Sequence, residues 1–295
     1  MMRRDIIFFF MLCLFVFCAG CMTVPDAAEE RPSESAHDLL LVAATIMPLQ
    51  AFVDYIGADT INTQVLLPPG SDPHTYELTP RERMRAEKAH VIVMIGVGMP
   101  FEASFVSQVK GTNQDIVIIN TSQSVSLLQE EDGHGIDPHI WLSPVTAQQI
   151  VTMIAEELSH VHPAYAIQYH ERATAFVEEL QELDNEFSDV LSRAQTTTFL
   201  VTHPSWGYVA DEYGLTQVSM YDHGKDPSPR TIKSLIDTAK AHDISVIIAD
   251  PLENQNAARV IAGAISGEVV VISPLAYEYV DNMRRFLYTI TRNEV

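Results

Sequence analysis

The chain has 295 residues, of which 47% are hydrophobic, and it carries a formal net charge of −21 at pH 7. This length and apolar content allow one or two sizeable cores, which excludes extensive intrinsic disorder. The sequence shows no cluster of Lys and Arg, which argues against nucleic-acid binding and leaves a soluble or cation-handling protein.

The N-terminal stretch has the pattern of an exported protein. Arg3 and Arg4 precede an apolar run over residues 6–17, and small residues then lead to Cys21. Because the run is too short to span a membrane comfortably, it predicts a signal peptide over residues 1–20. The ending CAGC resembles a bacterial lipobox, so we expect Cys21 to be lipidated and to become the mature N-terminus. An ordinary signal peptide and an uncleaved anchor are the alternatives.

The cysteine content agrees with this prediction. All three cysteines lie within residues 1–21, so the rest of the chain can form neither a disulfide framework nor a thiolate metal site. Residues 21–37 are polar and contain Pro and Glu, which is typical of a flexible tether between an anchor and a folded body.

From residue 39 onward, short apolar runs alternate with amphipathic stretches. The apolar runs predict buried strands at 39–45, 61–67, 90–96, 115–120, 196–202, 217–220, 244–250 and 269–273. The amphipathic stretches, several of which begin at a Ser-Pro or Thr-Pro pair, predict helices at 47–57, 80–89, 101–109, from 144, from 229, at 254–265 and at 275–292. Near-continuous apolar strands separated by helices are typical of parallel sheets covered on both faces.

One segment is much longer than an ordinary crossover helix. Residues 162–194 contain no glycine and no proline after Pro163, so they predict a helix of about thirty residues, or roughly 45 Å. A helix of this length is suited to spanning two domains. We therefore expect an α/β fold with lobes at 38–160 and 195–295, joined by a linking helix over 161–194.

Three histidines stand beside prolines in predicted loops. His74 lies in SDPHTYE, His139 in DPHIWLSP and His203 in VTHPSWGY. Ligands of open α/β sheets bind beyond the carboxyl ends of the strands, so these side chains could converge on a metal ion. The alternative is three solvated loop histidines, because their spacing carries no local ligand signature. The neighbouring Trp141 and Trp206 could hold the imidazoles in place or simply belong to the core.

Five strings, in order, carry a family resemblance: LLPPGSDPHTYELTP, DPHIWLSP, THPSWGYVADEYGL, DPSPRTIKSLIDTAKA and SPLAYEYVDNMRR. They resemble the signatures of the metal-binding substrate-binding lipoproteins of ABC transporters, a zinc and manganese family that includes proteins described as adhesins. The resemblance covers roughly residues 39–290. It implies two βα lobes bridged by a long rigid helix, with a metal ion in the cleft between them. It further implies that His74 and His139 bind the metal from the first lobe and His203 from the second.

The same resemblance implies a function. The protein is expected to capture a divalent metal ion outside the cytoplasm and to deliver it to an ABC permease and its ATPase. It is expected to be a monomer, not an enzyme, and to be held by lipid at the outer face of the membrane or in the periplasm. Manganese-type relatives tend to have a carboxylate where this chain has His203. Three imidazoles favour zinc, with manganese, iron and nickel as alternatives.

The fourth ligand is the open point of the predicted site. Relatives commonly place an Asp before a proline near the last strand, but this chain has Ser273 there, and serine is a poor zinc ligand. Water is the first candidate, and Asp222, His223 and Ser273 are weaker ones. Asp250 in ADPLEN is interpreted as a supporting or structural residue.

A hydrolase and an adhesin are the two other classes of function that the sequence leaves as alternatives. Three histidines and a water on zinc would suit a hydrolase, but no general base is obvious, with Glu77 and Asp222 as the only suggestions. An adhesin is the other class, and the sequence contains no adhesive repeat. The loop that holds His134 predicts only a weak metal-collecting role.

Overall fold

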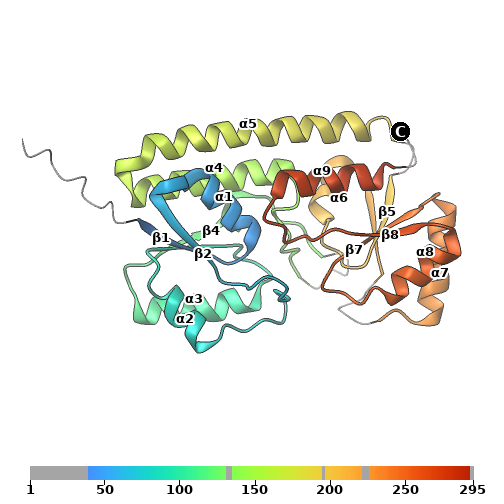
Figure 1. The fold of residues 1–295 in the computed structure, drawn as a ribbon, viewed down its shortest axis with the longest axis horizontal. Coiled ribbons are helices and arrows are strands. Elements are labelled where there is room, and N and C mark those ends of the chain that lie inside the picture. The colour runs from blue at the N-terminus through green and yellow to red at the C-terminus, as the bar shows by residue number, and fades with distance from the viewer. Residues whose placement is uncertain (1–38, 131–134, 195–196, 221–225, 293–295) are drawn as a thin grey trace, which may run out of the picture. The chain divides into compact units, whose positions relative to one another are not determined.

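A computed structural model describes residues 39–130, 135–194, 197–220 and 226–292 (Figure 1). Residues 38–295 form one compact unit. The predicted signal peptide, the tether and Cys21 lie outside the described residues. In the part of the chain that is described, every helix is too short or too polar to cross a lipid bilayer.

The first half of the unit is built on a four-stranded parallel sheet with the order β2-β1-β3-β4. Val42 at its centre pairs with Thr63 on one side and Val91 on the other. The strands are β1 Leu40–Ala44, β2 Ile61–Val65, β3 Val91–Met94 and β4 Val117–Asn120. The accompanying helices are α1 Met47–Gly57, α2 Pro80–Ala86, α3 Pro100–Thr112 and α4 Pro144–Val161, with short 3-10 turns at Ala58–Thr60 and Thr121–Ser124.

The second half repeats this arrangement. Its parallel sheet has the order β6-β5-β7-β8, which is the strand order of the first sheet counted along the chain. The strands are β5 Thr198–Val201, β6 Thr216–Ser219, β7 Val246–Ala249 and β8 Glu268–Val271. The helices are α6 Gly207–Tyr213, α7 Pro229–Ala241, α8 Asn256–Ile265 and α9 Tyr279–Ile290. The expectation of parallel α/β sheets in two lobes is confirmed.

The long helix α5, Ala166–Leu191, has 26 residues and is about 39 Å long. It begins later than residue 162 because Pro163–Tyr165 form a 3-10 turn ahead of it. One face is buried at a spacing of three or four residues: Tyr169, Ala173, Phe176, Leu180, Leu183 and Phe187. This face packs on α1 and α4 of the first half and on α6 and α9 of the second, so the helix spans both (Figure 1).

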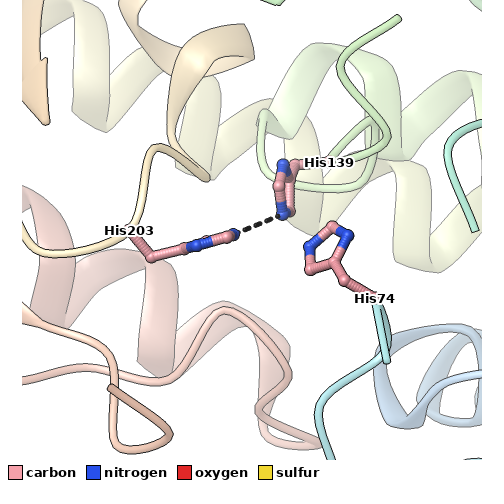
Figure 2. Close-up of side chains that lie close together, drawn as sticks. All are labelled: His74, His139 and His203. Carbon is pink, nitrogen blue, oxygen red and sulfur yellow. Dashed lines mark hydrogen bonds between the residues drawn. The ribbon is translucent and has the colours of Figure 1, made fainter. Parts of the chain in front are cut away.

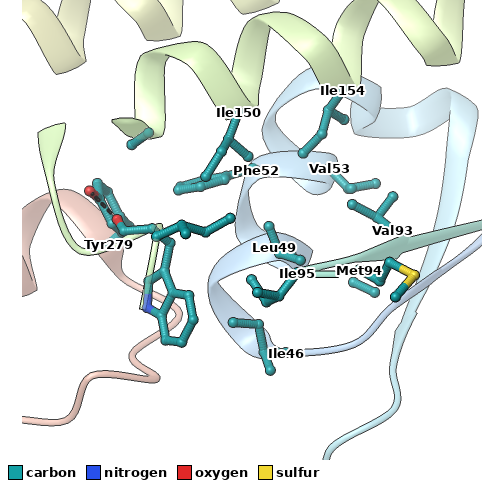
Figure 3. Close-up of a cluster of buried hydrophobic side chains, with 14 of the residues drawn as sticks. Ile46, Leu49, Phe52, Val53, Val93, Met94, Ile95, Ile150, Ile154 and Tyr279 are labelled. Carbon is teal, nitrogen blue, oxygen red and sulfur yellow. Dashed lines mark hydrogen bonds between the residues drawn. The ribbon is translucent and has the colours of Figure 1, made fainter. Parts of the chain in front are cut away.

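The buried core also crosses from one half to the other. Leu49 and Phe52 of α1 pack with Ile150 of α4, and Tyr279 of α9 joins them (Figure 3). The rings of Phe52 and Tyr279 meet edge to face with centroids 5.0 Å apart. The predicted lobe boundaries at 160 and 195 stay a prediction, because the larger of the two buried clusters draws on both halves of the unit.

Candidate metal site

The three histidines singled out in the sequence lie together, although they come from distant loops (Figure 2). Each offers a ring nitrogen to a group whose atoms all lie within 4.8 Å of one another. His139 Nε2 and His203 Nε2 are 3.3 Å apart. Two nitrogens bound to one tetrahedral zinc ion at the usual bond length would be separated by about 3.3 Å. The spacing of this pair therefore already matches zinc coordination.

The loop of His74 is held by local hydrogen bonds. Asp72 Oδ1 accepts from the His74 backbone N–H at 2.9 Å, and Asp72 Oδ2 accepts from the Thr75 hydroxyl at 2.9 Å. At the end of the loop, Thr79 and Glu82 form a capping box that begins α2. These contacts present the ring from a short, constrained turn.

The His74 ring is suited to bind a metal ion through a neutral ring nitrogen. Its Nε2 is buried and, within the described part of the chain, has no hydrogen-bond partner. Burial, together with the neighbouring His139 and His203, lowers the pKa of His74 to about 4. A buried nitrogen that has no partner and resists protonation is suited to receive a metal ion.

His139 is the most enclosed of the three, with 5% of its surface exposed. Its Nδ1 lies 2.7 Å from Asp137 Oδ1, and its backbone N–H donates to the same oxygen at 2.9 Å. The Tyr208 hydroxyl, on α6 of the second half, donates to the Asp137 carbonyl at 3.2 Å and accepts from the Leu128 N–H. The segment that carries His139 is thus fixed by residues of the second half.

Trp141 strengthens this attachment. Its indole N–H donates to the Pro274 carbonyl at 2.7 Å, and its own carbonyl accepts from the Tyr279 hydroxyl at 2.8 Å. The ring is fully buried and lies beside His139, with centroids 5.4 Å apart. Of the two roles considered for this tryptophan, the structure shows both: it is a core residue, and it packs against an imidazole of the cluster.

His203 follows β5 and faces two acids. Its Nδ1 lies 3.6 Å from Glu253 Oε1. Asp250 is buried, which raises the pKa of its carboxyl group, and its Oδ1 accepts from the Leu252 N–H at 2.8 Å. Asp250 therefore shapes the loop after β7, which agrees with its interpretation as a supporting residue.

Ser273 is the candidate for a fourth ligand that lies in the described part of the chain. Ser273 Oγ accepts from the Leu275 N–H at 3.1 Å. It lines a cavity between the halves together with Met47, Leu67, Pro68, Gly70, Pro251, Leu252 and Leu275. Asp222, His223 and His134 lie outside the described residues. Among the residues that are described, no further His, Cys, Asp or Glu joins the cluster, so water stays the predicted fourth ligand.

Two residues close to the three histidines, Asp137 and Glu253, are not predicted from the sequence. A signal for Asp137 existed, because Asp-Pro-His occurs twice, at 72–74 and 137–139. In both copies the carboxylate accepts from the histidine backbone N–H at 2.9 Å. Glu253 had no comparable signal, since it reaches His203 only through the fold.

Comparison with known proteins bears on what this site does. A family model described as "Zinc-uptake complex component A periplasmic", ZnuA, matches residues 42–293. The high-affinity zinc uptake system protein ZnuA of Bacillus subtilis is 28% identical over 281 residues, 89% of this chain and 88% of that protein. The zinc-binding lipoprotein AdcA of Streptococcus pneumoniae is 28% identical over 255 residues, 81% of this chain, which spans 50% of AdcA.

Solved structures agree with these relatives. A crystal structure of ZnuA superposes with a TM-score of 0.81 at 33% identity, covering 86% of this chain and 99% of that one. A zinc-bound ZnuA deletion mutant gives 0.80 at 32% identity, covering 87% and 98%. A laminin-binding adhesin of Streptococcus agalactiae shares the fold alone, with a TM-score of 0.77 at 24% identity, covering 86% and 99%. The matched family consists of transport components rather than enzymes, so the hydrolase alternative is set aside. The predicted family resemblance is confirmed: the chain belongs to the ZnuA family of zinc-uptake components.

Proposed function

We propose that this protein binds zinc outside the cytoplasm through His74, His139 and His203 and delivers it to an ABC permease. The observation that carries the proposal is the convergence of three imidazoles with donor nitrogens within 4.8 Å of one another. The family is one of periplasmic zinc-uptake components, and its relatives ZnuA and AdcA are named for zinc uptake and zinc binding.

The donor set favours zinc over harder cations. Imidazole nitrogens are good ligands for zinc, whereas manganese prefers carboxylate and other oxygen donors. Asp137 and Glu253 face the Nδ1 atoms of their histidines, so they supply negative charge around the site without entering the cluster. A water molecule completing a four-coordinate ion fits a site that must later release its cargo.

Membrane attachment through Cys21 is a separate part of the proposal. The lipobox-like CAGC motif supports it, and the relative AdcA is described as a lipoprotein. A lipid and a tether would hold the protein near its permease and raise the effective concentration of the zinc-loaded form. Fractionation of cells expressing the wild type and Cys21→Ser tests this, because the variant should leave the membrane fraction.

The site assignment is tested by zinc titration against a chelator of known affinity. Structural zinc binding of about 10–16 kcal/mol shared over four ligands is roughly 3 kcal/mol per ligand, or about a hundredfold in affinity. We expect that loss from each of His74→Ala, His139→Ala and His203→Ala. His170→Ala, an exposed histidine on α5, is the matched control and should bind like the wild type. Tight zinc binding by the His74→Ala/His203→Ala double variant would overturn the assignment.

A further inference from the structure

We propose that zinc binding switches the tautomer of His203, with Asp137 enforcing the switch through His139 and Glu253 accepting the hydrogen bond that results. Asp137 and Glu253 are then positioning residues, each acting through one histidine. The inference rests on the proposed function, since it concerns how the same three-histidine site receives its ion.

The first step is the tautomer of His139. Asp137 has 6% of its surface exposed, and its Oδ1 lies 2.7 Å from His139 Nδ1. An ionised carboxylate only accepts hydrogen bonds, so Nδ1 of His139 must carry the proton. The lone pair of this neutral ring is then on Nε2, which faces His203. Asp137 thus commits His139 to the tautomer that can bind a metal through Nε2.

The second step is the tautomer of His203 without metal. The two Nε2 atoms are 3.3 Å apart, which allows a hydrogen bond between them, and such a bond needs one N–H. Since His139 Nε2 holds a lone pair, the donor is His203 Nε2–H. Nδ1 of the neutral His203 ring then also holds a lone pair, and this lone pair faces Glu253.

The position of Glu253 fits this assignment. Its Oε1 is 3.6 Å from His203 Nδ1, too long for a hydrogen bond, whereas the Asp137 carboxylate is 2.7 Å from His139 Nδ1. A lone pair facing a carboxylate explains the longer separation. The Glu253 side chain is 24% exposed, which leaves it freer to move than the enclosed Asp137. The nearby Asp250 has its Oδ1 already bonded to the Leu252 N–H.

Zinc binding would reverse the tautomer of His203. The ion needs the Nε2 lone pair, so the proton on Nε2 leaves to solvent and a proton from solvent is added at Nδ1. The ring stays neutral, no net proton is released, and Nδ1–H now donates to Glu253. In the loaded protein both Nδ1–H groups are held by carboxylates, an arrangement that raises the basicity of ligating imidazoles.

The test is long-range proton–nitrogen NMR on protein with ¹⁵N-labelled histidine at neutral pH, before and after addition of zinc. We expect His139 to show Nδ1–H in both states. His203 should change from Nε2–H to Nδ1–H when zinc binds. Asp137→Asn should disturb the His139 tautomer of the zinc-free protein and weaken zinc binding about 10- to 100-fold.

Glu253→Ala distinguishes positioning from a general charge effect. We expect its zinc-free tautomers to match the wild type and its zinc affinity to fall about tenfold. Glu77→Ala removes the same charge from an exposed position on the His74 loop and should leave affinity unchanged. Nδ1–H on His203 before zinc is added, or wild-type affinity in Glu253→Ala, would overturn the switch while zinc binding stands. A wild type that fails to bind zinc would overturn the proposed function and the switch together.

Discussion

Replacing Gly207 with alanine should weaken zinc binding from outside the cluster of ligands. Gly207 is the first residue of α6, and a Cβ built there would lie 2.4 Å from Asp137 Oδ2 and 3.7 Å from Asp137 Cγ. Ordinary contact begins near 3.4 Å, so the carboxylate must shift by about 1 Å. A shift of that size would lengthen the 2.7 Å bond from Asp137 to His139 Nδ1 beyond useful range.

The magnitude follows from the bond that is lost. A hydrogen bond to a charged group contributes about 1.5–3 kcal/mol, which corresponds to roughly 10- to 150-fold in affinity. Alanine is favoured over glycine in helices by up to about 1 kcal/mol, which offsets part of the strain in the fold. Zinc affinity should therefore fall much more than the free energy of unfolding of the zinc-free protein.

Chelator-competition titration and urea unfolding of the same samples measure both quantities. Gly263→Ala on α8 is the matched control, because a Cβ there meets nothing within 4 Å. It should stabilise the protein by up to about 1 kcal/mol and leave zinc affinity unchanged. Wild-type zinc affinity in Gly207→Ala would refute the reasoning that Asp137 holds His139 in its binding state.

Three further predictions concern stability. The pKa of His74 is about 4 in the folded protein against 6.5 for the free side chain, so the zinc-free wild type should lose stability as pH falls from 6.5 to 4, by on the order of 3 kcal/mol. His74→Asn should lack this loss in pH-dependent urea unfolding; parallel curves would contradict it. Burial raises the pKa of Glu102 from 4.5 to about 7, so the free energy of unfolding should fall as pH rises through that window. Glu102→Gln should show a flatter dependence of this free energy on pH, and an equally steep one would contradict burial as the cause. Tyr208→Phe leaves the Asp137 carbonyl and the Leu128 N–H without their partner and should cost about 1–3 kcal/mol in urea unfolding; no loss would mean that water replaces the hydroxyl.

Much of the fold follows from local pattern. The predicted helix at 47–57 matches α1, because Pro48 and the periodic apolar residues specify its start and its buried face. The sequence pattern does not predict helix α6, since this helix has only seven residues and begins at a glycine. The sequence predicts that α5 starts at 162 rather than at Ala166, because sequence pattern does not distinguish the 3-10 turn at Pro163 from a helix.

The candidate site, like the fold, is predicted only in part by the sequence. His74, His139 and His203 could be named from their motifs, and their convergence is a property of the tertiary fold. The role of Asp137 does not follow from its Asp-Pro-His motif, because the contact between its carboxylate and the His139 ring depends on side-chain geometry. Glu253 reaches His203 from a loop fifty residues away, and nothing in the sequence alone indicates that distance.

The segment around His139 belongs to the first half along the chain, and hydrogen bonds attach it to the second half as well. Trp141 is bonded to Pro274 and Tyr279, and Asp137 is bonded to Tyr208. If the two halves of the protein move apart while these bonds stay intact, His139 and His203 remain together on the second half. His74 stays on the first half and is separated from them. With the three histidines as the proposed ligands, such an opening would remove a single imidazole, and the remaining pair would hold zinc about a hundredfold more weakly.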